Sequence, residues 1–205
     1  MVSLSILIPT PGRGRPLKRC LKSIVSQPLL PGDECIVIGD VTDGPLPEVE
    51  AMVADFGPQF KYVEHTTGEH DFGHSQLNYG MFIADGDYIT FCDDDDVYVE
   101  GAFDAIRAAA QEHPGAPLMF RFVTRFRTLL WATKEIRQDW VGGHSFVVPN
   151  VKARLAPWAP RYQGDYDHIR GTVDNWPGKD SAVVWREEVI SFARPDTPGA
   201  QGGAL

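Results

Sequence analysis

An alternation of apolar runs and amphipathic segments in the first half of the chain is the strongest constraint on its fold. Residues 2–8, 34–40 and 88–92 are short apolar runs typical of buried strands. Residues 16–27 carry apolar side chains at helical spacing and end before a proline. The same alternation continues with helices at 47–56, 75–84 and 100–112 and a short strand at 61–65. This order predicts a Rossmann-like α/β fold, with a mostly parallel central sheet flanked by helices.

The second half is less regular, with stretches rich in proline and tryptophan. Its strand-like runs are at 117–126, 129–134, 144–149 and 181–185. At 205 residues the chain fits one globular domain. We therefore predict a single domain over residues 1–195 with an irregular C-terminal half. Residues 196–205 have no apolar periodicity, which predicts a flexible tail.

The charge of the chain argues against a nonspecific polyanion-binding surface. The formal net charge is −9 and the pI is near 5.1. A local basic site remains open, because Arg121, Arg125 and Arg127 cluster in RFVTRFR. These arginines could form a solvated strand face or bind an anionic ligand.

The cysteines and the apolar runs bear on the compartment. Cys20, Cys35 and Cys92 lie in apolar segments without close pairing or metal-type spacing, which predicts buried free thiols in a reducing compartment. The apolar N-terminus is too short for a signal sequence, and no run approaches the roughly 20 apolar residues of a membrane span. We therefore expect a cytoplasmic protein without a membrane span.

Polar residues follow three of the predicted strands. Pro9 and Thr10 end the first strand, Asp40 ends the second, and the block Asp93–Asp96 follows the strand at 88–92. In open parallel sheets, ligands bind beyond the carboxyl ends of the strands. The three strand ends therefore predict a ligand site along one edge of the sheet.

The four aspartates Asp93–Asp96 repel one another unless a cation is close. Mg²⁺ and similar hard cations take one or two carboxylates together with substrate phosphates, so a cation and a diphosphate would account for the block. A solvated acidic turn or helix start is the structural alternative. Asp165 and Asp167 form a second acidic pair, which could supply a general base or simply begin a helix.

Three segments carry a resemblance to a known family. VSLSILIPTPGRGRPLKRCLKSIVSQ is a strand ending in Pro-Thr, then a loop with arginine and a helix. ECIVIGDVTDG is a strand with an acidic end, and GHSQLNYGMFIADGDYITFCDDDDVY runs from a helix with asparagine to an Asp-x-Asp metal motif. In this order and spacing, residues 2–112 and, more loosely, GDYDHI resemble the family-two glycosyltransferases of the A-type fold.

The resemblance implies a metal-dependent, inverting transfer of a sugar from a nucleotide-diphospho-sugar donor to a hydroxyl acceptor. The implied cation is Mn²⁺ or Mg²⁺, and a UDP-sugar is the expected donor. Residues 1–112 would form the nucleotide-sugar-binding half and residues 113–195 the acceptor-binding half. The acceptor stays open among a saccharide, a protein side chain and a modified nucleobase.

The resemblance also implies roles for individual residues. Asp165 would be the catalytic base, with Asp167 as the alternative, and Asp95 would ligate the cation. From its position after a Gly-Gly pair, His144 is predicted as a second metal ligand or an acceptor contact. Asp96 is expected to be structural, at the turn into the next helix. The predicted donor-binding residues are Pro9, Thr10, Arg13, Asp40, Asn78, Asp93 and Asp94.

The chain departs from the family pattern at three places. Gly39 stands where an acidic residue is usual, Leu77 replaces a frequent arginine, and Gly164 replaces a common glutamate. Leu77 removes a cation near the expected diphosphate. Arg13, Lys18 or the metal must then compensate.

Two other classes of function remain open. The loop TPGRGRPLK weakly resembles the phosphate-binding loop of nucleotidyltransferases, which would act on a sugar phosphate. A non-catalytic nucleotide-sugar-binding module is the alternative to an enzyme. His70 and His74 flank a loop expected to approach the sugar, and the five tryptophans can fill the core or stack on sugar rings.

Overall fold

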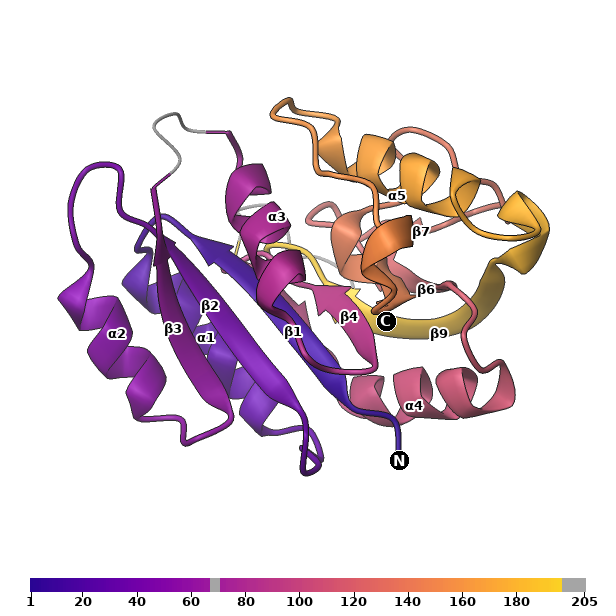
Figure 1. Cartoon of the computed structure of the whole chain (residues 1–205). Helices are drawn as coiled ribbons and strands as arrows, with labels where there is room; N and C mark the ends of the chain where they lie inside the picture. Colours follow the sequence, from indigo (N-terminus) through magenta and orange to yellow (C-terminus); the bar gives the residue numbers. More distant parts are fainter. Residues whose placement is uncertain (67–70, 197–205) are drawn as a thin grey trace.

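A mixed β-sheet in the order β3-β2-β1-β4-β8-β6-β9-β5, with β7 paired to β6, forms the centre of the structure (Figure 1). The computed structural model describes residues 1–66 and 71–196. The strands are β1 Leu4–Thr10, β2 Glu34–Asp40, β3 Phe60–His65, β4 Tyr88–Phe91, β5 Val97–Tyr98, β6 Leu118–Val123, β7 Leu129–Leu130, β8 Phe146–Pro149 and β9 Val184–Phe192. The α-helices are α1 Gly14–Val25, α2 Pro47–Ala54, α3 His74–Ile83, α4 Ala102–Glu112 and α5 Gly164–Asp174. Short 3₁₀ helices are η1 Gly143–Ser145, η2 Lys152–Arg154 and η3 Lys179–Ala182.

The first four strands of the sheet, β3, β2, β1 and β4, are all parallel. Thr10 of β1 pairs with Gly39 of β2, and Leu7 of β1 pairs with Phe91 of β4. The carboxyl ends of these strands therefore meet at one edge of the sheet. This arrangement confirms the predicted α/β fold class.

The second half of the chain extends the same sheet in mixed directions. β8 is antiparallel to β4, β6 is antiparallel to β8, and β9 is parallel to β6. The strand expected at 181–185 begins at Val184 and continues to Phe192, whereas the run at 129–134 contributes only the two residues of β7. The charged stretch Arg186–Glu188 interrupts the apolar pattern, so apolar runs alone do not predict the full length of β9.

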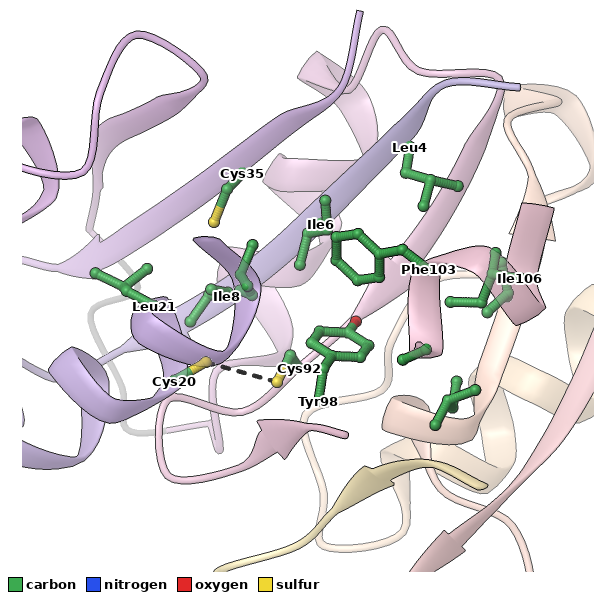
Figure 2. Close-up of a cluster of buried hydrophobic side chains, with 14 of the residues drawn as sticks. Leu4, Ile6, Ile8, Cys20, Leu21, Cys35, Cys92, Tyr98, Phe103 and Ile106 are labelled. Atoms are coloured by element: carbon green, nitrogen blue, oxygen red, sulfur yellow. Dashed lines mark hydrogen bonds between the residues drawn. The ribbon is translucent and has the colours of Figure 1, made fainter. Parts of the chain in front are cut away.

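Hydrophobic side chains fill both faces of the sheet. One cluster joins β1 to α1 and α4, and Figure 2 shows Ile8 of the strand near Leu21 of α1 and Ile6 near Phe103 of α4. The Sγ atoms of Cys20 and Cys92 lie 3.6 Å apart in this cluster (Figure 2). In the described part of the chain, all three cysteines are buried free thiols, as predicted.

The second hydrophobic cluster packs α3 and α5 against the other face of the sheet. Trp131, Trp158 and Trp176 are buried in it, so these rings fill the core. Among the described residues, the structure has no helix long and apolar enough to cross a membrane. The predicted tail lies outside the described residues from position 197 onward, and so does His70.

Candidate donor-binding and catalytic cleft

A cleft of about 470 Å³ opens at the carboxyl ends of β1, β2 and β4. The first half of the chain supplies part of its lining and the second half the rest. The polar and charged lining residues on which the site depends are Arg13, Asp40, His74, Asp93, His144, Asp165 and Arg194. The edge of the sheet that the sequence predicted as a ligand site is thus a concave surface.

Asp94 is fully buried within the aspartate block. Its carboxylate accepts a hydrogen bond of 2.6 Å from the Thr10 hydroxyl and is also paired with the Arg13 guanidinium. Thr10 and Asp94 were predicted to contact the donor directly. In the structure they form a hydrogen bond with each other beneath the cleft. Asp94 also forms an ion pair with Arg13, and Arg13 lines the cleft.

Two arginine side chains contact the same carboxylate oxygen of Asp95. Arg13 Nη1 lies 2.9 Å from Asp95 Oδ2, and Arg194 Nε lies 3.3 Å from the same atom. Arg19 Nη2 donates to the backbone carbonyl of Asp95 at 2.7 Å. The other carboxylate oxygen, Oδ1, is buried without a hydrogen-bond partner among the described residues.

Asp96 is buried and ties the second half of the chain to the block. Its Oδ1 accepts the backbone N–H of Arg194 at 2.9 Å, and its Oδ2 lies 3.2 Å from His144 Nδ1. A structural role was predicted for Asp96 at the turn into the next helix. Its Oδ1 instead anchors the backbone of Arg194, while Gly101 occupies the cap position of α4.

Asp93 is half-buried and faces the cleft. Burial, together with the nearby carboxylates of Asp165 and Asp95, raises the pKa of Asp93 to about 7. Added negative charge is unfavourable here, whereas a bound cation would be stabilised.

His144 lies on η1, directly before β8, with its ring packed edge-on against Phe122. Burial lowers the pKa of His144 to about 4, so the imidazole is neutral at pH 7. Its Nε2 is buried and has no hydrogen-bond partner in the described parts of the chain. A neutral imidazole with an unpaired nitrogen is the form that binds metals.

The donor atoms at Asp95 and His144 fit part of a divalent cation site. Asp95 Oδ1 and His144 Nε2 are both buried and unpaired in the described chain. No cluster of three histidine, cysteine or acidic side chains suited to a metal occurs within residues 1–66 and 71–196. A cation held by these two atoms would need its remaining ligands from substrate phosphates and water, as Mg²⁺ commonly takes them.

Asp165 lies in the first turn of α5 and lines the cleft. Gly143 donates its backbone N–H to Asp165 Oδ2 at 3.1 Å, and His74 Nε2 lies 3.9 Å from Oδ1. Asp167 instead forms two hydrogen bonds of 2.5 Å with Arg161, which lower its pKa. The geometry thus favours Asp165 over Asp167 for contact with a substrate.

Two of the departures from the family pattern have a steric reason. A Cβ on Gly39 would lie 2.4 Å from the hydroxyl oxygen of Tyr62 on β3. A Cβ on Gly164 would lie 2.4 Å from the ring of His74. These separations are far below van der Waals contact, so neighbouring aromatic side chains occupy the space that an acidic residue would need.

Of the other residues predicted to bind the donor, two line the cleft and one lies behind its wall. Pro9 and Asp40 line the cleft, and Asp40 Oδ1 accepts hydrogen bonds from the backbone and hydroxyl of Thr42. Asn78 bonds both backbone polar atoms of Trp158, at 3.0 and 2.8 Å. Because Trp158 lines the cleft, Asn78 positions the wall of the site instead of facing its interior.

Several cleft residues were not predicted from the sequence, among them Arg194, Phe72 and Tyr162. Arg194 follows β9 without a recognisable motif, so only the path of that strand brings it to the aspartates. Phe72 and Tyr162 are exposed at the rim, with ring centroids 6.2 Å apart in an edge-on arrangement. Exposed aromatic side chains on loops are a common signal of binding, but their pairing depends on the fold.

The fold and the cleft define an α/β protein with a ligand site at the carboxyl edge of its parallel strands. Residues 5–163 match the model of Glycosyl transferase family 2. The match covers most of the chain, so this protein belongs to that family, as its sequence segments predicted. Glycosyltransferase is the enzyme class of the family. No curated protein matches the sequence significantly.

Solved structures share the fold at low sequence identity. TarS 1–349 of S. aureus aligns with a TM-score of 0.71 and 12% identity over 93% of this chain and 60% of that chain. Its complex with UDP-GlcNAc has a TM-score of 0.70 and 12% identity over 99% and 62% of the two chains. The mannosyltransferase PcManGT from Pyrobaculum calidifontis, in complex with GDP-Man and Mn2+, gives 0.68 and 14% over 96% and 58%. The chain thus spans about 60% of the length of TarS 1–349.

Proposed function

We propose that this protein is a glycosyltransferase that moves a sugar from a nucleotide-diphospho-sugar to a hydroxyl acceptor, with a divalent cation and with inversion. The observation that carries the proposal is the meeting of Asp93, Asp165 and two arginines in one cleft of a family-two chain. The strand ends of the first half would bind the nucleotide end of the donor. The second half would supply the base and the acceptor site.

Donor binding would use the wall formed by Pro9, Asp40 and Arg13. Thr10 and Asp94 act beneath it, because their mutual hydrogen bond orients the Arg13 guanidinium. A UDP-sugar is the expected donor. A GDP-sugar is the second candidate, since solved relatives of the same fold bind UDP-GlcNAc and GDP-Man.

Asp95 and His144 would hold Mn²⁺ or Mg²⁺. This assignment is supported by two buried atoms without hydrogen-bond partners in the described chain, Asp95 Oδ1 and His144 Nε2. The cation would supply Lewis-acid neutralisation of the leaving diphosphate.

Asp165 would act as the catalytic base. The acceptor oxygen attacks the anomeric carbon while the bond from that carbon to the diphosphate oxygen breaks, and Asp165 accepts the hydroxyl proton. A single displacement of this kind inverts the anomeric configuration. The N–H of Gly143 fixes one carboxylate oxygen of Asp165 at 3.1 Å, which leaves the other for the acceptor.

The rim of the cleft favours a saccharide acceptor over a protein side chain or a modified nucleobase. Phe72 and Tyr162 expose aromatic rings that can pack on the apolar face of a sugar. Asp71 and Asp139 also line the cleft, and this negative charge disfavours a polyanion such as DNA.

A donor panel tests the proposal. UDP-, GDP-, CMP- and dTDP-sugars are incubated with the protein in Mn²⁺ or in EDTA, and release of the free nucleotide is measured. We expect one nucleotide to be released in Mn²⁺ only. Pyrophosphate release from a nucleoside triphosphate and a sugar phosphate would instead identify a nucleotidyltransferase, and metal-dependent binding without turnover would identify a binding module.

A further inference from the structure

We infer that Arg194 is a diphosphate-binding residue that neutralises Asp95 until a cation takes over that carboxylate. The inference rests on the proposed function, because it assumes a nucleoside diphosphate in the cleft. It goes further by assigning this task to an arginine from the C-terminal end of the described chain.

The arginines that line the cleft in the described structure are Arg13 and Arg194, and both meet the same atom, Asp95 Oδ2. Two guanidinium groups on one carboxylate oxygen balance an acidic block that would otherwise repel itself. The same two groups are the cationic side chains available to a polyphosphate in this cleft. Guanidinium groups bind phosphates through paired, charge-assisted hydrogen bonds.

The backbone of Arg194 is anchored although its side chain is accessible. The N–H of Arg194 donates to the buried Asp96 at 2.9 Å, and the preceding Ala193 donates to Val123 of β6 at 2.8 Å. Asp196 is paired with Arg19, which itself donates to the carbonyl of Asp95. The Arg194 side chain is 46% exposed. Its guanidinium can therefore turn into the cleft while its Cα stays in place.

Arg13 and Arg194 differ in how firmly the acidic block holds them. Arg13 pairs with both Asp94 and Asp95, and Asp94 is fully buried. In the described chain, the Arg194 guanidinium forms its ion pair with Asp95, at 3.3 Å, and that carboxylate is itself partly exposed. Asp93 and Asp96 are close enough to attract it as well, but neither forms an ion pair with it among the described residues. Arg194 is therefore the arginine that a competing cation at Asp95 displaces more easily, since like charges repel at that distance.

This exchange predicts effects of opposite sign in two binding measurements. Without nucleotide, Arg194→Ala removes a positive charge that competes for Asp95, so the affinity for Mn²⁺ alone rises. With saturating Mn²⁺, the same change removes a phosphate contact, so the affinity for UDP or GDP falls by roughly 10- to 100-fold. A residue with a purely structural role would weaken both.

Calorimetric titration of the full chain provides the test, first with Mn²⁺ alone and then with UDP and GDP in Mn²⁺. Arg194→Lys keeps the charge and should retain part of the nucleotide affinity. Arg125→Ala is the matched control, because Arg125 is exposed in the turn after β6 and stacks on Phe126 outside the cleft. It should leave both affinities unchanged.

The possible outcomes separate this inference from the proposed function. Unchanged nucleotide affinity in Arg194→Ala, or a loss of Mn²⁺ affinity together with nucleotide affinity, overturns the role of Arg194 alone. A wild-type chain that binds neither UDP nor GDP in Mn²⁺ overturns the proposed function and the inference with it. Thermal unfolding of each variant excludes misfolding as the cause of a lost affinity.

Discussion

The two halves of the molecule build the same cleft in different ways. In the first half, consecutive parallel strands end at one edge, and their polar residues contact one another directly, as Thr10 and Asp94 do. In the second half, η1, α5 and the end of β9 bring residues to the cleft from separate parts of the sheet. A regular sheet edge thus provides the binding wall, and irregular connections provide the groups that complete it.

The largest expected effect is on catalysis and belongs to the second half. Asp165→Asn removes the proton acceptor but keeps the shape of the side chain, so kcat should fall by about 10²- to 10⁴-fold while UDP or GDP affinity stays unchanged. Steady-state kinetics and calorimetry measure the two effects. Asp167→Asn is the control, because Asp167 is paired with Arg161 at the surface. Equal losses in both variants would contradict the assignment of the base.

The next effect belongs to the first half and concerns stability as well as binding. Asp94→Ala leaves the buried Thr10 hydroxyl and the Arg13 guanidinium without their shared acceptor. The free energy of unfolding should fall by about 3 kcal/mol, with weaker nucleotide binding. Urea denaturation measures the change, and Glu100→Ala, at an exposed position nearby, serves as control. A free energy of unfolding equal to that of the wild type would show that Asp94 does not stabilise the first half.

A smaller effect tests why the acidic pair is missing at the end of β2. Gly39→Ala should lower the free energy of unfolding by about 2 kcal/mol, because the new Cβ meets the Tyr62 ring. In a double-mutant cycle with Tyr62→Ala, the clash should disappear and the cost of Gly39→Ala should be smaller. Additive losses in the cycle would refute the steric explanation.

The smallest expected effect concerns Lys18, an exposed residue of α1 outside the residues that line the cleft. Lys18→Ala should change nucleotide affinity by less than about twofold, since exposed charges are screened over a Debye length. Arg13→Ala, measured in the same titration, should weaken binding strongly. A comparable loss in both variants would mean that the donor extends toward α1 beyond the described cleft.

Local sequence patterns predicted most of the structure of the first half. The strands, helices and polar strand ends there follow from apolar periodicity and from the carboxyl-edge rule for parallel sheets. Asp40, Asp93 and Asp165 line the cleft, and their roles in donor binding and catalysis stay predictions. Arg194 and the full length of β9 were not predicted from the sequence, because charged residues interrupt the strand and no local motif marks its end.

The α/β class and the family follow from patterns of residues close together in the chain. The polar edge of the sheet follows from the rule that parallel strands share their carboxyl ends. The burial and the contacts of each aspartate in the block, in contrast, depend on the tertiary structure. Asp94 and Asp96 became buried anchors, while Asp95 came to face two arginines from opposite ends of the chain. Burial and long-range pairing set these contacts, and the spacing of four identical residues does not predict either.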